Sequence, residues 1–96
     1  GIAPEAAFDV IENSAVAAPM ISYRKPLYLD EAAHDVTFTV ALAKKDMAVT
    51  AALAEALGTA MPQGRVTLER LEAAERAGYG ARDMAAILAF MRESKG

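Results

Sequence analysis

The 96-residue chain carries ten Lys and Arg against thirteen Asp and Glu, a formal net charge of −3. Proteins that bind nucleic acid through phosphate groups need a clustered basic surface, so this acidic balance with scattered basic residues argues against a nucleic-acid partner. The 54% hydrophobic content, rich in alanine and poor in aromatic residues, favours one small domain of close-packed helices.

Metal and membrane sites are also disfavoured by the composition. The chain has no Cys and a single His34, which excludes disulfides, thiolate metal sites and a two-histidine metal site. No apolar run reaches the length of a membrane span, and no signal-peptide pattern opens the chain. A soluble, cytoplasmic domain without a membrane or metal partner is therefore expected.

Two short helices and a loop are predicted for the first third of the chain. Pro4 and Pro19 each suit the first position of a helix. Pro26 is predicted to end the second helix, because a proline inside a helix removes a hydrogen bond. Residues 27–36 then form a loop held by its large side chains, in which His34 is interpreted as a surface or capping residue rather than a catalytic one.

A long helix from about Thr37 to Leu57 is the element around which the domain is expected to be built. It contains no Gly or Pro, it has Thr37 or Asp35 as a candidate N-cap, and it stops at Gly58. At roughly 100° per residue, five large apolar residues share one arc of the helix. They are Phe38, Leu42, Val49, Leu53 and Leu57.

Two opposite charges, Lys45 and Asp46, fall within this apolar arc or at its edge, whereas Lys44 points to the far side and is expected to be solvated. A face made only for packing would carry apolar residues at both positions. Charges at least half buried there need a partner or a ligand to offset their desolvation. The packing alternative is that Lys45 extends to solvent and Asp46 pairs with a cation on a neighbouring helix.

The remaining residues predict two further helices. One runs from about residue 63 or 64 to Arg76, with Gly78 as a left-handed cap, and the other begins at Arg82 and Asp83. No strand pattern is found, so the fold class is all-α, with about five helices around the 37–57 helix and no sheet. Because that helix is apolar nearly all round, the domain is expected to pack against another domain, another copy of itself, or both.

Taken alone, the residues contain no catalytic motif, but their order resembles a known family. Phe38-x6-Lys45-Asp46-Met47, in a helix that ends at Gly58, resembles the Phe-x6-Lys-Asp-Leu run in the C-terminal domain of the β-hydroxyacid dehydrogenases. These include 3-hydroxyisobutyrate dehydrogenase, tartronate semialdehyde reductase and 6-phosphogluconate dehydrogenase-like enzymes. The opening Gly1-Ile2-Ala3-Pro4-Glu5 and the segment from Tyr79 to Ala86 resemble two further family segments.

The resemblance implies that residues 1–96 are a single helical domain, the C-terminal fragment of a two-domain dehydrogenase, without its Rossmann domain and catalytic linking helix. The implied function is to complete the active-site cleft and the oligomer contact of an NAD(P)-dependent enzyme. That enzyme would transfer a hydride between a short 3-hydroxy acid and its semialdehyde. The implied partners are the protein's own N-terminal nucleotide-binding domain, the small hydroxy acid and a second copy of the chain, with NAD or NADP as cofactor.

Roles follow for three residues by the same resemblance. Lys45 matches a lysine that reaches the cofactor near its nicotinamide end, and Phe38 and Asp46 match residues that line the substrate pocket. No catalytic residue is assigned in the chain, which alone is expected to be inactive. Two alternatives stay open: a non-catalytic helical dimerisation module and an unrelated helical bundle.

Overall fold

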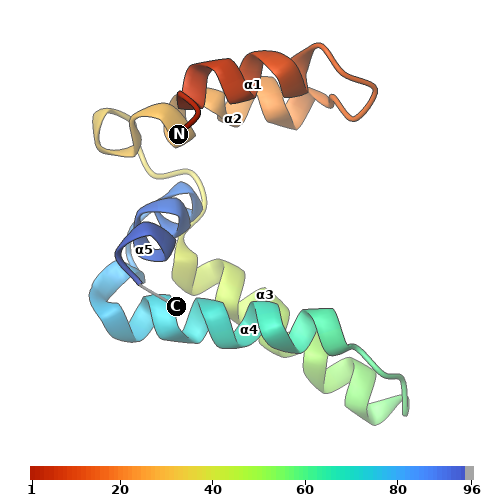
Figure 1. Ribbon diagram of the computed structural model, residues 1–96. Helices are drawn as coiled ribbons and strands as arrows, with labels where there is room; N and C mark the ends of the chain where they lie inside the picture. The colour runs from red at the N-terminus through yellow and green to blue at the C-terminus, as the bar shows by residue number, and fades with distance from the viewer. Residues whose placement is uncertain (95–96) are drawn as a thin grey trace. The chain divides into compact units, whose positions relative to one another are not determined.

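The computed structural model describes residues 1–94, which form five α-helices and contain no β-strand (Figure 1). The predicted all-α class is thus confirmed. These residues belong to two compact units, Gly1–Asp35 and Val36–Gly96, each of which is considered by itself. Across the described residues, no helix combines the length and the apolar character that a membrane span requires.

The first unit is a helical hairpin. Helix α1 spans Pro4–Glu12 and helix α2 spans Pro19–Leu29, each with its proline in the first turn as predicted, and a 3-10 turn follows at Glu31–Ala33. The two helices pack side by side (Figure 1). Between them the rings of Phe8 and Tyr28 lie with centroids 6.0 Å apart.

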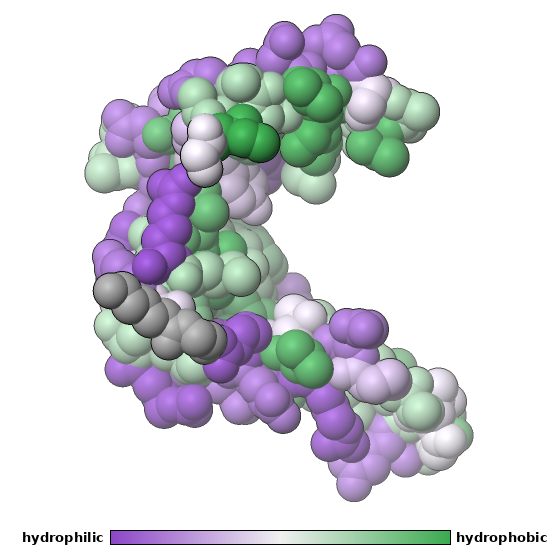
Figure 2. Space-filling view, viewed as in Figure 1, coloured by the Kyte–Doolittle hydropathy of each residue, from purple (hydrophilic) through white to green (hydrophobic). Residues whose placement is uncertain are grey.

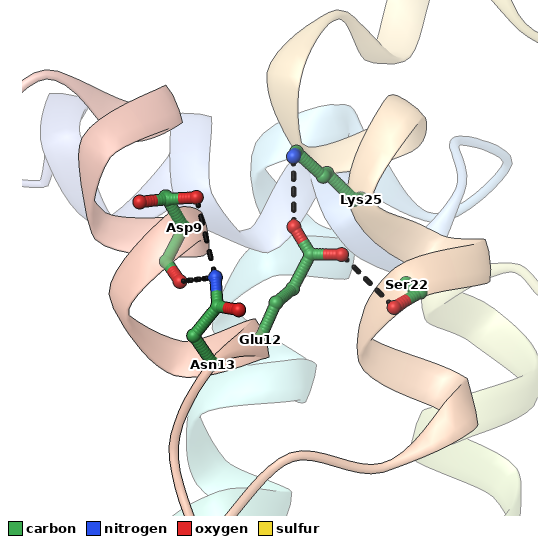
Figure 3. A network of polar contacts seen from close by, with 5 residues as sticks. All are labelled: Asp9, Glu12, Asn13, Ser22 and Lys25. Carbon is green, nitrogen blue, oxygen red and sulfur yellow. Dashed lines mark hydrogen bonds and ion pairs between the residues drawn. The ribbon is translucent and has the colours of Figure 1, made fainter.

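A polar network also ties α1 to α2 (Figure 3). The Glu12 carboxylate accepts hydrogen bonds from Lys25 Nζ at 2.7 Å and from Ser22 Oγ at 2.9 Å. Lys25, and then Ser22, lower the pKa of Glu12, and Glu12 in turn raises the pKa of Lys25. Because the pKa of Glu12 is lowered in the folded state, the stability that it contributes is lost as the pH falls through that lowered pKa.

The prediction that Pro26 ends the second helix is wrong, and so is the loop assigned to the residues directly after it. Helix α2 continues to Leu29 with Pro26 inside it. The proline carbonyl still accepts a hydrogen bond from Asp30 N at 3.0 Å. An internal proline costs about 3 kcal/mol, and burial of Leu27 together with the Phe8–Tyr28 contact supplies a comparable stabilisation, about 2–4 kcal/mol.

The second unit contains α3 (Val40–Ala56) and α4 (Pro62–Ala74), which pack along each other (Figure 1). A π-helical turn at Glu75–Tyr79, a 3-10 turn at Met84–Ala86 and α5 (Ile87–Glu93) follow. Gly58 and Gly78 have positive φ values of 67° and 97°, which agrees with their predicted role as helix ends. The buried core of the unit consists of Val40, Ala43, Leu71, Ala74, Tyr79, Ala86 and Phe90.

Helix α3 begins later than the sequence predicts. Its N-cap is Thr39, whose side-chain oxygen accepts a hydrogen bond from Leu42 N at 3.0 Å, and neither Thr37 nor Asp35 caps it. The N–H groups of Thr37 and Phe38 instead donate to the Asp83 carboxylate. The Phe38 carbonyl, which would bond Leu42 N if the helix began earlier, accepts instead from Met84 N at 2.7 Å. Both residues lie before the helix, so Phe38 does not share the predicted helical arc.

Candidate functional site

Helix α3 presents two different apolar faces, one buried and one exposed. Val40 and Ala43 are buried in the core, with Met47 partly buried against it. On the second face the four remaining large residues of the predicted arc are exposed: Leu42, Val49 and Leu53 of α3, and Leu57 directly after it. These residues therefore share one face, as predicted, but that face is exposed within this unit. The face that packs in the core is the one that carries Val40, Ala43 and Met47.

Exposed apolar side chains also occur in the first unit. Val10, Val16 and Met20 are exposed, and Figure 2 shows apolar side chains at the surface of α1 and α2. The apolar surface of the chain is therefore not confined to α3. The open face of α3 carries two charged residues, Lys45 and Asp46, among its apolar side chains.

Lys45 and Asp46 lie together on this open face. Their side chains are 65% and 59% exposed, and Lys45 Nζ is 3.8 Å from Asp46 Oδ1. The prediction that both charges are at least half buried is thus wrong for this chain. An exposed ion pair of this kind contributes only about 0–1 kcal/mol. Both charged groups can therefore bind a ligand at little cost in stability, whereas breaking a buried ion pair would be strongly destabilising.

The neighbouring Lys44 is not the solvated residue that the sequence predicts. Its Nζ lies 2.6 Å from Glu75 Oε1, and this ion pair joins α3 to the π-helical turn. Two adjacent lysines of α3 therefore differ in their surroundings. Lys44 is held within the fold, and Lys45 extends from the open face beside Asp46.

Phe38 lies before α3, where it is partly buried and packs against the core cluster. Its backbone N–H donates to Asp83 Oδ2 at 3.3 Å, and its carbonyl accepts from Met84 N at 2.7 Å. The structure therefore brings Lys45 and Asp46 together but does not place Phe38 on the same helical face. The sequence places Asp83 at the start of the last helix and does not predict its bonds to residues 37 and 38. A buried acidic residue at that position gives no local signal of a partner so far away in the sequence.

Other parts of the chain do not add to this site. His34 is exposed. Within residues 1–94 no group of three or more acidic or histidine side chains lies close enough to hold a metal ion. A pocket of about 300 Å³ opens where α3 ends and α4 begins, and its lining includes Glu55, Thr59 and Arg65 but none of the three predicted site residues. The candidate site is thus the exposed apolar face of α3 with its two charged residues. A second protein surface placed against this face would form a cleft with it.

A family described as "NAD-binding of NADP-dependent 3-hydroxyisobutyrate dehydrogenase" matches residues 1–91, nearly the whole chain. The chain belongs to this family of NAD(P)-dependent oxidoreductases, which confirms the resemblance at the level of the family and of the cofactor that the family uses. No individual curated sequence gives a significant match.

Proposed function

We propose that the chain is the C-terminal helical domain of an NAD(P)-dependent β-hydroxyacid dehydrogenase. It would complete the active-site cleft against a nucleotide-binding domain that precedes it. The observation that carries this proposal is the exposed Lys45–Asp46 pair within the open apolar face of α3. A helix face that only packed would not carry two charges there, and a face that was only solvated would not carry four large apolar residues around them.

The chemistry of these residues suits a dinucleotide and a small hydroxy acid. NAD(P), when bound, accepts or supplies the hydride that moves between the substrate carbinol carbon and the nicotinamide ring. The Lys45 ammonium can donate to carboxamide, ribose or phosphate oxygens near the nicotinamide end of the cofactor. The Asp46 carboxylate can accept a hydrogen bond from a hydroxyl group of the substrate.

The apolar side chains of the face would exclude water from the reacting atoms. Phe38 would add an aromatic wall to the substrate pocket, a role proposed for it by the family resemblance. The hydroxyl proton must go to a base, and no residue of this chain is assigned that role. The remaining machinery is therefore proposed to lie in the preceding domain and its linking helix.

The upstream reading frame provides the first test. We expect a strand followed by Gly-x-Gly-x-x-Gly, and then a helix that contains Gly-x-x-Gly-x-Gly-x3-Lys. The full-length protein should then oxidise 3-hydroxyisobutyrate or a related 3-hydroxy acid with NADP⁺ or NAD⁺, followed by absorbance of the reduced nicotinamide. The 96-residue chain alone should show no turnover under the same conditions. Turnover by the isolated chain would refute the proposal that hydride transfer requires the preceding domain.

The open face of α3 also favours a second candidate function, a helical dimerisation module. We expect the isolated chain to self-associate, because three large apolar residues of α3, and Leu57 directly after it, are exposed to water. Light scattering at micromolar concentration should give a mass above the single-chain 10.1 kDa. Val49→Glu with Leu53→Glu should restore the monomer mass, because charges on the face oppose its burial.

Val66→Glu provides the matched control, since Val66 is an exposed apolar residue of α4 and not of the α3 face. It should leave the mass of the associated chain unchanged. A monomer mass for the unaltered chain would contradict self-association through this face. Self-association combined with a cofactor affinity that does not depend on Lys45 would favour the module over the dehydrogenase domain.

A further inference from the structure

Asp83 is a buried charged residue that the proposed function does not yet use. It is 1% exposed. Its Oδ1 accepts a hydrogen bond from Ala85 N at 2.9 Å, so it caps the 3-10 turn that leads into α5. Its Oδ2 accepts from Thr37 N at 3.0 Å, Thr37 Oγ1 at 3.1 Å and Phe38 N at 3.3 Å.

The backbone around Asp83 reinforces this attachment. Met84 N donates to the Phe38 carbonyl at 2.7 Å, and Val40 N donates to the Arg82 carbonyl at 3.0 Å. Ala41 N donates to the Gly80 carbonyl at 3.0 Å. The first N–H groups of a helix lack intrahelical partners, and residues 80–82 supply acceptors for two of them. Phe38 is thus held through both its N–H and its carbonyl, directly before α3.

A cap alone would not require a carboxylate at this position. One oxygen suffices to cap a helical turn, and Ser, Thr or Asn can supply it. The second oxygen of Asp83 accepts from residues 37 and 38, and the charge of the carboxylate strengthens those bonds. An asparagine in its place would have only one acceptor oxygen, and its NH₂ group would face N–H donors on one side. Those donors would lose their acceptor in a buried setting, which is costly.

We propose that Asp83 is the positioning residue for Phe38 in the substrate pocket. It holds the backbone of Thr37 and Phe38 so that the Phe38 ring keeps its place at the start of α3. Asp83 acts on the substrate through Phe38 and leaves the cofactor contact at Lys45 unaffected. This inference depends on the proposed function, which assigns the wall of the substrate pocket to Phe38.

The test uses the full-length protein and separates the KM values of substrate and cofactor. We expect Asp83→Asn to raise the KM for the hydroxy acid about tenfold while the KM for NAD(P) stays within about twofold. Thr37→Val, which removes a single donor to Asp83, should raise the substrate KM by about threefold. Thr37→Ser keeps the hydroxyl group and should restore the wild-type KM.

A structural control distinguishes positioning from general loosening of α5. The Tyr79 hydroxyl donates to the Glu93 carboxylate elsewhere in the same unit. Tyr79→Phe should lower the melting temperature and leave the substrate KM unchanged. If Asp83→Asn does not fold, Thr37→Val and Thr37→Ser still decide the question, because Thr37 is exposed and both side chains are close to its size.

Double-mutant cycles with Phe38→Ala give the sharpest result. If Asp83 acts through Phe38, then Thr37→Val or Asp83→Asn should add little to the KM change that Phe38→Ala already causes. Additive effects would overturn the inference, as would a substrate KM that responds to Phe38→Ala but not to Asp83→Asn or Thr37→Val. A substrate KM that Phe38→Ala leaves unchanged would instead refute the role of Phe38 in the proposed function, and the inference with it.

Discussion

Replacing Lys45 by Met in the full-length protein is expected to weaken NAD(P) binding by about tenfold to a hundredfold. A hydrogen bond from a charged group contributes about 1.5–3 kcal/mol, and each 1.4 kcal/mol is a factor of about ten in affinity. The Met side chain keeps the apolar stem and removes the charge. Since Lys45 is 65% exposed and pairs only weakly with Asp46, the melting temperature should hardly change.

Lys44→Met is the matched control for this prediction. It removes the same charge from the adjacent position of the same helix, but from a lysine that binds Glu75. We expect it to lower the stability by at most about 1 kcal/mol and to leave cofactor affinity unchanged. Titration calorimetry with NADP⁺ and with NAD⁺ measures both variants. Equal affinities for Lys45→Met and the unaltered protein would remove Lys45 from the cofactor site and favour the packing interpretation of α3.

Leu71→Ala is expected to be the most destabilising of the simple core substitutions. Leu71 lies on α4, is 2% exposed and belongs to the core cluster with Val40 and Ala43 of α3. Truncating a buried leucine removes its transfer free energy and leaves a cavity, which together lower the free energy of unfolding by about 2–5 kcal/mol. Small domains have about 5–15 kcal/mol in total, so this loss is a large fraction.

Leu53→Ala makes the same chemical change at an exposed position of α3, where the side chain is 58% exposed. It should alter the free energy of unfolding by less than about 0.5 kcal/mol. Urea denaturation of both variants, followed by circular dichroism at one low protein concentration, gives the comparison. Similar midpoints for the two variants would show that α4 does not pack on α3 through Leu71 as the structure describes.

Several helix boundaries could be predicted because they depend on local chemistry. Pro19 begins a helix, and Gly58 and Gly78 end helices, since these residues act through their own backbone geometry. Pro26 was misjudged because the local cost of a proline competes with burial of Leu27, which depends on the packing partner. The start of α3 differs from the prediction for a similar reason, since the donor that occupies the Phe38 carbonyl is Met84 N, distant in the sequence.

The amino-acid sequence by itself determined that the chain is helical, where most helices lie, and that Lys45 and Asp46 share one side of α3 with large apolar residues. Periodicity along one helix is sufficient for these conclusions. Only the tertiary structure decided which side of α3 is buried, because both sides are apolar and the choice depends on the fit to Leu71 and Ala74 of α4. The tertiary structure also decided which of the two adjacent lysines is paired within the unit, because this depends on where Glu75 lies. Lys44 pairs with Glu75, whereas Lys45 lies on the open face.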